Sequence, residues 1–248
     1  MPKESFLKRL PWYPYEAWAA LWFVLLMLLS ALWALPIYLI FGAKAHRIYF
    51  IGYKIWARLW FLLAFIDFRR KGMSHRNPAL PAVIAANHSC HLDLLNGAAV
   101  SPIRVKALAK VELRKIPVLG LMFQTASVFV DRSSPQSREA SFQALQQTLA
   151  KGYSLFMFPE GSRNRSQELL RPFYDGAFRL AVTANRPILP LVFTGTTQVM
   201  PMQGIKLRPG RITAHFLAPE WPNPQAQNPV EELRNRVFQQ MENTLKSE

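Results

Sequence analysis

Two short motifs hold residues that could do chemistry together. Residues 87–93 read NHSCHLD and follow a short apolar run, so His88 and Asp93 lie five positions apart. Residues 158–163 read FPEGSR and follow a second apolar run. A histidine oriented by a carboxylate can act as general base on a hydroxyl, and an arginine in an exposed loop can bind an anion. Together the motifs predict transfer chemistry at a hydroxyl group of an anionic substrate.

The spacing of His88 and Asp93 sets a condition on the backbone. On one continuous α-helix, five positions turn two side chains ~140° apart. Direct contact therefore requires His88 in a turn and Asp93 inside the helix that follows. A strand at residues 81–86 leading into such a turn meets this condition. Asp93 would then hold one ring nitrogen as a donor, and the free backbone N–H groups of the helix entrance would favour developing negative charge.

Three other interpretations of this motif remain open. The first is an ordinary capped helix with Asp93 on the surface. The second is a metal site, for which the residue types are suitable but the ligands fall too close together in sequence to converge easily on one ion: His88, Cys90, His91 and Asp93. The third is Cys90 as a covalent nucleophile, which is disfavoured because a lone cysteine is usually a buried, inert side chain.

The second motif predicts a phosphate-binding loop. Gly161 permits a tight, exposed backbone, and Arg163 can bind a phosphate with two parallel hydrogen bonds. Arg165 and Arg171 add positive charge nearby. Glu160 would either orient these arginines or accept a hydrogen bond from a substrate hydroxyl. The alternative is an ordinary surface turn.

The N-terminal quarter differs from the rest of the chain. Residues 17–43 form 27 consecutive uncharged positions, which is long enough to cross a bilayer, since a spanning helix needs ~20 apolar residues. Pro36 predicts a kink or a hairpin break within this run. Residues 48–68 are also apolar but carry Lys54 and Arg58 on one helix face. We favour a helix lying in the membrane interface over a second span, because two cations inside a span are costly.

The charge pattern indicates a membrane surface. The chain has 30 Lys and Arg against 15 acids, for a formal charge of +15, and residues 44–76 hold eight cations and one acid. In a soluble protein this balance would suggest nucleic acid, but beside an apolar segment it favours anionic headgroups. It would also attract an acidic carrier protein. Cys90 is the single cysteine, so there is no disulfide framework, as is usual in the cytosol.

The remainder predicts an α/β fold, a mixed sheet covered by helices. The expected organisation is a membrane-embedded helical segment at residues 1–70 and a catalytic domain at residues 71–248. Helices are expected to begin near Ser134 and Asn228, which are suited to N-caps. The expected strands are residues 81–86, 104–109, 127–130, 153–158, 188–194 and 212–217.

In combination, the motifs resemble the 1-acylglycerol-3-phosphate acyltransferase family. Its pattern of Asn-His, four residues and Asp, followed by Phe-Pro-Glu-Gly-Thr/Ser-Arg, is matched at residues 87–93 and 158–163. Further blocks match in order, and the resemblance spans residues 81–192: KVEL at residues 110–113 with Ile116, Pro117 and Gly120, FVDR at 129–132, and RPILP at 186–190. Many members carry a cation after the Pro-Phe that follows the third block. Here residues 172–176 read PFYDG, which leaves the acceptor headgroup open.

The resemblance implies a helix-covered α/β sheet with a membrane-embedded N-terminal motif. It implies that His88 is the catalytic base and Asp93 its orienting partner, that the arginine of the second block contacts the acceptor phosphate, and that RPILP contributes to a substrate pocket. The residues expected to bind substrate are Arg132, Glu160, Gly161, Ser162 and Arg163.

The expected reaction moves a fatty acyl group from acyl-coenzyme A or acyl-carrier protein to the free hydroxyl of 1-acylglycerol-3-phosphate, giving phosphatidate. No metal or tightly bound cofactor is expected, and the expected partners are the lipid substrates, the bilayer and an acyl-carrier protein, with no nucleic acid. The catalytic domain is expected at the membrane, facing the cytoplasm. Three alternatives remain: acylation of another lyso-lipid such as a lyso-aminolipid, a metal-dependent lipid hydrolase, and a non-catalytic membrane-binding module.

Overall fold

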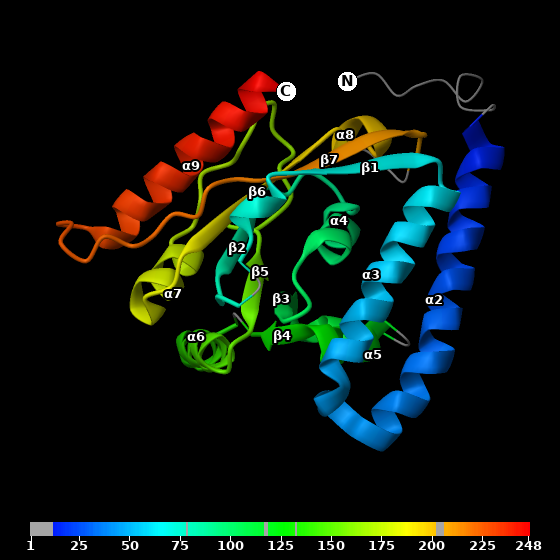
Figure 1. Cartoon of the computed structure of the whole chain (residues 1–248), viewed down its shortest axis with the longest axis horizontal. Helices are drawn as coiled ribbons and strands as arrows, with labels where there is room; N and C mark the ends of the chain where they lie inside the picture. Colours follow the sequence, from blue (N-terminus) through cyan, green and yellow to red (C-terminus); the bar gives the residue numbers. More distant parts are fainter. Residues whose placement is uncertain (1–11, 78, 117–118, 132, 202–205) are drawn as a thin grey trace.

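A seven-stranded mixed sheet forms the centre of the molecule (Figure 1). The computed structural model describes residues 12–77, 79–116, 119–131, 133–201 and 206–248. The strand order is β1-β7-β6-β2-β5-β3-β4, and each neighbouring pair is parallel except β6 with β7. The strands are β1 (Ile66–Lys71), β2 (Val83–Ala86), β3 (Val105–Lys110), β4 (Ser127–Val130), β5 (Ser154–Met157), β6 (Ile188–Thr194) and β7 (Gly210–Phe216).

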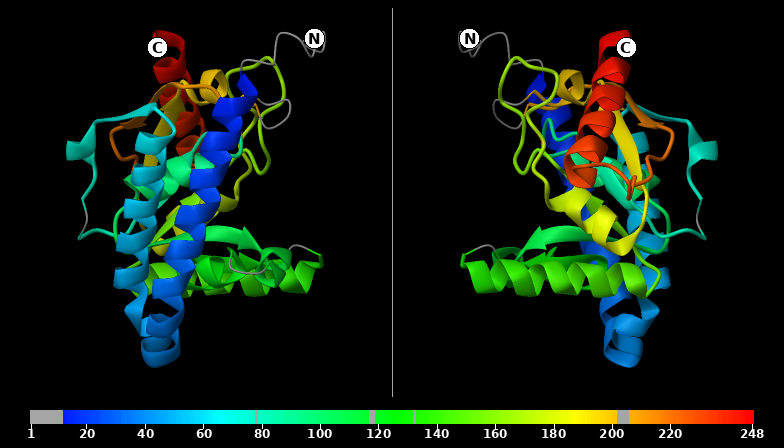
Figure 2. Two further views of the ribbon diagram at one scale, coloured as in Figure 1. Left: turned by 90° about the vertical axis from the view of Figure 1, so that its right-hand side faces the viewer. Right: turned by 90° about the vertical axis from the view of Figure 1, so that its left-hand side faces the viewer.

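Helices cover both faces of this sheet (Figure 2). On one face lie α3 (His46–Leu63), α4 (Asp93–Val100) and α5 (Leu119–Ala126), and on the other α6 (Pro135–Ala150), α7 (Gly176–Ala184) and α9 (Pro229–Ser247). The remaining elements are α2 (Tyr13–Phe41), η2 (Gly42–Ala45), η3 (Met73–His75), η4 (Val111–Lys115) and α8 (Thr196–Val199). The predicted fold class, a helix-covered mixed sheet, is confirmed.

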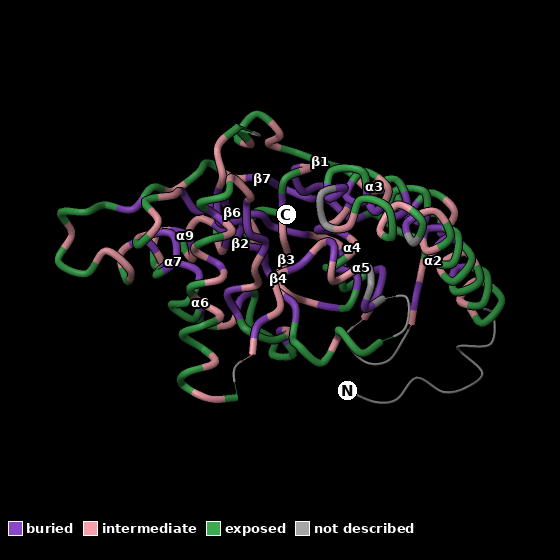
Figure 3. Tube along the Cα trace, turned by 90° about the horizontal axis from the view of Figure 1, so that it is seen from below, coloured by how far each residue is buried: buried purple, intermediate pink, exposed green. Residues whose placement is uncertain are grey.

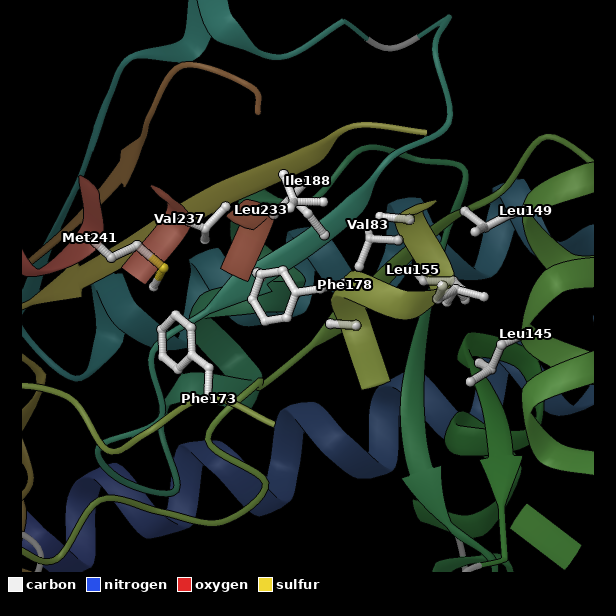
Figure 4. Close-up of a cluster of buried hydrophobic side chains, with 14 of the residues drawn as sticks. Val83, Leu145, Leu149, Leu155, Phe173, Phe178, Ile188, Leu233, Val237 and Met241 are labelled. Carbon is white, nitrogen blue, oxygen red and sulfur yellow. The ribbon is translucent and has the colours of Figure 1, made fainter. Parts of the chain in front are cut away.

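The core on the α6–α7–α9 face is formed by side chains that alternate along the strands (Figure 4). Leu155 of β5 points to this face, while the next residue, Phe156, packs on the opposite one. Phe178 of α7 and Leu233 of α9 complete the cluster, and each is fully buried. Burial on both faces explains why the central strands read as continuous apolar runs rather than alternating ones.

The predicted helix starts are correct. The Ser134 hydroxyl accepts a hydrogen bond from the Ser137 N–H at 3.0 Å and caps α6. The Asn228 side chain accepts from the Glu231 N–H at 3.3 Å and caps α9. The six predicted strands also occur, with ends shifted by no more than a few residues.

β1 was not predicted as a strand, because its first residues look like the end of the apolar stretch at 48–68. In the structure α3 ends at Leu63, and β1 then pairs in parallel with β7. Its burial is confined mainly to Ile66, as expected for an edge strand with charged residues. The predicted domain boundary at residue 70 therefore falls inside a strand of the central sheet.

α2 and α3 form an antiparallel hairpin beside the sheet (Figures 1 and 3). The predicted break at Pro36 does not occur, because α2 continues through Pro36 to Phe41. The chain reverses instead at η2, where Gly42 has a φ of +52°, a conformation that glycine adopts without a Cβ penalty. α2 is the one described helix that is long and apolar enough to cross a membrane.

The outer surface of the hairpin is apolar. Lys54 and Arg58 of α3 point inward and donate hydrogen bonds to the Ser101 and Ala99 carbonyls at the C-terminal end of α4. They thereby satisfy carbonyls that the helix itself leaves open. The opposite side of the hairpin exposes large apolar side chains, among them Leu25, Leu28, Leu29, Leu32 and Leu39 of α2 and Ile48, Ile55, Leu59 and Leu62 of α3.

Candidate active site

The motif at residues 87–93, in which the sequence predicts the catalytic residues, spans the turn between β2 and α4. We call this segment the catalytic turn. β2 ends at Ala86, and α4 begins at Asp93, so His88 lies in the turn. The His88 Nδ1 and the Asp93 Oδ2 are 3.0 Å apart. With Nδ1 held by the carboxylate, Nε2 is the nitrogen that can accept a proton from a substrate. None of the described residues engages Nε2, and the His88 side chain keeps 16% of its surface exposed.

Asp93 is held more tightly than an exposed carboxylate would be. Its side chain is fully buried, and its Oδ2 also accepts the N–H groups of Ser89 at 2.5 Å and Cys90 at 2.8 Å. The Asn96 side chain reaches its Oδ1 at 3.4 Å. We expected these backbone N–H groups to serve a developing charge on the substrate. In the structure they instead fix the carboxylate that orients His88.

The FPEGSR loop and the residue after it, Asn164, hold the backbone of His88. The Glu160 Oε1 accepts the His88 N–H at 2.7 Å, and the His88 carbonyl accepts the Asn164 N–H at 2.6 Å. The other Glu160 oxygen accepts the Arg171 N–H at 3.0 Å. Burial raises the pKa of the Glu160 carboxyl. Glu160 is 1% exposed, so it joins the two motifs rather than orienting the arginine side chains or facing a substrate.

Three arginines surround a polar pocket next to this loop. Arg163, Arg165 and Arg171 line it with the hydroxyls of Ser162 and Ser166. Arg171 donates to the Ser162 hydroxyl, and Arg163 contacts His91 Nε2. Burial, followed by the positive charge of Arg163, lowers the pKa of His91, so this imidazole favours the neutral form that accepts from an arginine. The arrangement suits a phosphate group.

An apolar cavity of about 360 Å³ lies on the other side of the catalytic turn, beneath α4. His91 is on its wall, and its lining includes Phe50, Tyr53 and Trp56 of α3, Leu94 and Gly97 of α4, Phe123 of α5 and Phe156 of β5. Two aromatic contacts connect Phe156, on the wall of the cavity, to the His88 ring. The His88 ring stacks on Phe158 at 4.0 Å, and Phe158 meets Phe156 edge to face at 5.1 Å.

The four candidate metal ligands do not converge on one point, because each contacts a different partner. His88 and Asp93 face each other, His91 faces Arg163, and the Cys90 sulfur accepts the Leu92 N–H at 3.3 Å. Burial, together with the nearby Asp93, raises the pKa of Cys90 to about 12, so its thiol stays protonated. A buried thiol in this state is a poor nucleophile.

Other predicted residues fall in different places. Arg132 and Pro117 lie outside the described residues. The RPILP block forms the start of β6, next to β2, where Ile188 and Leu189 are buried in the sheet. Gly161 has a φ of +70°, and a Cβ there would lie 2.8 Å from the Tyr174 ring.

Two functional roles escaped the sequence reasoning. Asn87 clamps the catalytic turn to β6, because its side chain accepts the Phe193 N–H at 2.7 Å and donates to the Phe193 carbonyl at 3.0 Å. The signal was its place directly after a buried strand. Phe158, the first residue of the second motif, supplies the ring beneath His88. Its pairing with a residue about seventy positions away could not be read from spacing.

The PFYDG segment, which lacks the cation that many family members carry after the Pro-Phe, packs against the FPEGSR loop. Asp175 does not line the arginine pocket, and its carboxylate forms an ion pair with Arg234 of α9 at 2.6 Å. Tyr174 covers Gly161, and its N–H donates to the Pro159 carbonyl at 2.9 Å. The segment therefore braces the FPEGSR loop.

Fold and site together define the class: a helix-covered α/β protein with a histidine–aspartate pair between an anion pocket and an apolar cavity. A family model described as Acyltransferase matches residues 67–194, about half of the chain. The chain belongs to this acyltransferase family, and its resemblance to the 1-acylglycerol-3-phosphate acyltransferases is confirmed at the family level.

Individual relatives agree with this assignment. The chain is 34% identical over 140 residues to the 1-acyl-sn-glycerol-3-phosphate acyltransferase of Limnanthes douglasii, covering 56% of this chain and 50% of the relative. It is 32% identical over 170 residues to that of Saccharomyces cerevisiae, covering 67% and 56%. It thus spans about half the length of the curated relatives it matches.

The fold has a match among solved structures. The crystal structure of the 1-acyl-sn-glycerophosphate (LPA) acyltransferase PlsC from Thermotoga maritima aligns with a TM-score of 0.72. The alignment covers 92% of this chain and 97% of that one at 21% identity, a likeness that concerns the fold.

Proposed function

We propose that this chain transfers a fatty acyl group from an acyl thioester to the free hydroxyl of 1-acylglycerol-3-phosphate and so forms phosphatidate. The observation that carries the proposal is the position of the His88–Asp93 pair. It lies between a pocket of three arginines, suited to a phosphate, and an apolar cavity, suited to an acyl chain. The names of the matched relatives support the same activity.

The pair supports direct transfer. His88 Nε2 takes the proton of the acceptor hydroxyl as the hydroxyl oxygen attacks the thioester carbonyl carbon. The carbon–sulfur bond then breaks, and the imidazolium returns the proton to the departing thiolate. Asp93 keeps the imidazole in the required tautomer and stabilises its charged form. These steps conserve every proton on His88 and the reactants, so the proposed reaction requires no metal and no cofactor.

The arginine pocket supports a phosphorylated acceptor. A phosphomonoester held by Arg163 and Arg171 would lie beside the loop whose backbone fixes His88. Anchoring the phosphate in this way would set the distance between the acceptor hydroxyl and Nε2, which is the main contribution of a positioning group to rate.

The hairpin supports access from a membrane. Its exposed apolar residues and the length of α2 suit insertion into a bilayer, from which a lysolipid substrate can reach the site. We propose that the catalytic domain faces the cytoplasm, where acyl thioesters are made. Either acyl-coenzyme A or an acyl-carrier protein would serve as donor.

The test is an acceptor and donor panel with the purified full chain in detergent. The acceptors are lysophosphatidate, a lyso-aminolipid and monoacylglycerol, each offered with palmitoyl-coenzyme A and with palmitoyl-acyl-carrier protein. Lysophosphatidate should be preferred, and His88→Ala should lower its turnover by ~10²–10⁴-fold while leaving lysolipid binding intact. Equal turnover of the wild type and His88→Ala would reject the proposal.

One observation favours a second candidate, acylation of another lyso-lipid. Tyr174 stands where many family members carry a cation, and it lies at the edge of the FPEGSR loop. A higher kcat/KM for the lyso-aminolipid in the same panel would select this candidate. Loss of activity with EDTA would instead favour the metal-dependent hydrolase.

Arg163→Lys tests phosphate recognition separately. Lysine keeps the charge but loses the planar fork, so the KM for lysophosphatidate should rise about tenfold. The KM for monoacylglycerol, which has no phosphate, should stay unchanged. An equal rise for both acceptors would remove Arg163 from phosphate binding.

A further inference from the structure

A second hollow lies on the opposite face of the sheet from the apolar cavity. It has a volume of about 490 Å³ and runs between α6 and α7 over the carboxyl ends of β3, β4 and β5. Its floor is apolar, formed by Leu108, Val130, Phe142 and Met157. We call this hollow the α6–α7 groove.

The inner end of the groove touches the catalytic loop. Gly161 and Ser162 line it there, and Ser162 also lines the arginine pocket. Glu160, the preceding residue, holds the His88 N–H. An occupant of the groove would therefore end close to the reaction centre.

A cation also lines the groove. Arg138, in the first turn of α6, lines the groove, and no acid among the described residues forms an ion pair with it. Asp131 also lines the groove, and its carboxylate accepts the Ser133 N–H at 2.9 Å. The groove thus combines an apolar floor with one cation, Arg138, and one carboxylate that already has a partner.

This combination fits one part of an acyl thioester. Lipid chains would reach the protein from the α2–α3 hairpin, which lies on the other side of the sheet. A ligand from water that has an anion at one end, apolar and amide groups in the middle and a thioester at the other end matches the groove. Resting on the proposed function, we propose that the α6–α7 groove binds the phosphopantetheine arm of the acyl donor, with its phosphate at Arg138 and its sulfur near Gly161.

Gly176 offers a way to block the groove without disturbing the fold. It lines the groove at the first position of α7, and a Cβ built on it meets no atom within 4 Å. In the full-length protein, Gly176→Leu and Gly176→Trp should raise the KM for palmitoyl-coenzyme A in order of size, by about tenfold for Trp. The KM for lysophosphatidate should change less than about twofold. Thr183→Trp, at an exposed position on the same helix, is the matched control and should leave both KM values unchanged.

Arg138→Gln tests the phosphate end with two donors. Its KM for palmitoyl-coenzyme A should rise about fivefold, whereas the KM for S-palmitoyl-N-acetylcysteamine, a thioester without the phosphate, should not change. Lys151→Gln removes a cation at the other end of α6 and serves as the control. Palmitoyl-acyl-carrier protein carries the same arm, so Arg138→Gln should raise its KM too.

The outcomes separate the two proposals. A wild-type protein without transferase activity would reject the proposed function. An active wild type whose Gly176→Trp and Arg138→Gln variants keep a normal donor KM would reject the groove assignment alone. A rise in the KM for lysophosphatidate instead of the donor would assign the groove to the acceptor and overturn the inference.

Discussion

The catalytic turn and the outer face of the α2–α3 hairpin differ in whether their groups have partners within the protein. Around His88, the backbone N–H and carbonyl, the Asp93 carboxylate and the side-chain amide of Asn87 all find partners inside the protein. On the hairpin, large apolar side chains remain exposed, whereas monomeric soluble proteins keep such patches small. The first region finds its partners within the chain, whereas the second leaves a broad apolar surface open. In the proposed function, the chain organises the chemistry, and access to the lipid depends on the bilayer.

The largest expected effect concerns the catalytic turn. Asp93→Asn should lower the single-turnover rate of acyl transfer by ~10³–10⁴-fold, because an amide no longer fixes the tautomer of His88. Rapid-quench measurement with lysophosphatidate checks this. Asp67→Asn, which alters an exposed ion pair with Arg69 and Arg211, is the control and should keep the normal rate. A small loss in Asp93→Asn would show that the pair does not orient the base.

The next effect concerns the outer face of the α2–α3 hairpin. Leu28→Asp with Leu32→Asp should shift the protein from membranes to the soluble fraction, since each charge at a helix centre costs ~2.5–3.5 kcal/mol in lipid. Activity on long-chain lysolipid in vesicles should fall sharply, and activity on a short-chain, water-soluble acceptor should fall much less.

Gln225→Asp with Gln227→Asp adds the same charge at exposed positions and should leave membrane binding unchanged. A high-salt wash should not release the wild type, because apolar insertion is not screened by ions. Release by salt alone would mean that the hairpin is held by charge.

A smaller effect tests how the two motifs are joined. Glu160→Gln replaces one of two acceptor oxygens with a donor, so either the His88 or the Arg171 N–H loses its partner. The free energy of unfolding should fall by ~1–3 kcal/mol. The melting temperature should fall by about 2–4 °C for each kcal/mol lost. Glu168→Gln, an exposed carboxylate of the same loop, should melt as the wild type does.

The smallest effect is expected at Cys90. Cys90→Ala should keep turnover within about twofold, because burial holds the thiol protonated and turned to the Leu92 N–H. Iodoacetamide should likewise not alkylate Cys90 in the folded protein, as checked by mass spectrometry. Loss of activity in Cys90→Ala, or after treatment with iodoacetamide, would instead support Cys90 as a covalent nucleophile.

The sequence predicted most elements whose patterns are local. The caps at Ser134 and Asn228 and the strands β4 and β6 follow from neighbouring residues, and they occur where expected. β1 was missed, because its identity as a strand comes from pairing with β7, about 140 positions away in the chain. Of the two outcomes predicted for Pro36, a kink or a break, the break does not occur: α2 continues through Pro36, and the chain reverses at Gly42.

By itself, the sequence determined the residue types, the strand–turn–helix placement of His88 and Asp93, and the family to which they point. Those features depend on spacings of a few residues, which backbone geometry fixes. Only the tertiary structure decided that Glu160 joins the two motifs, that Phe158 lies beneath His88, and that the anion pocket and the apolar cavity flank the catalytic turn. These contacts join segments some seventy residues apart. The two segments meet because they follow the carboxyl ends of β2 and β5, which pair in parallel.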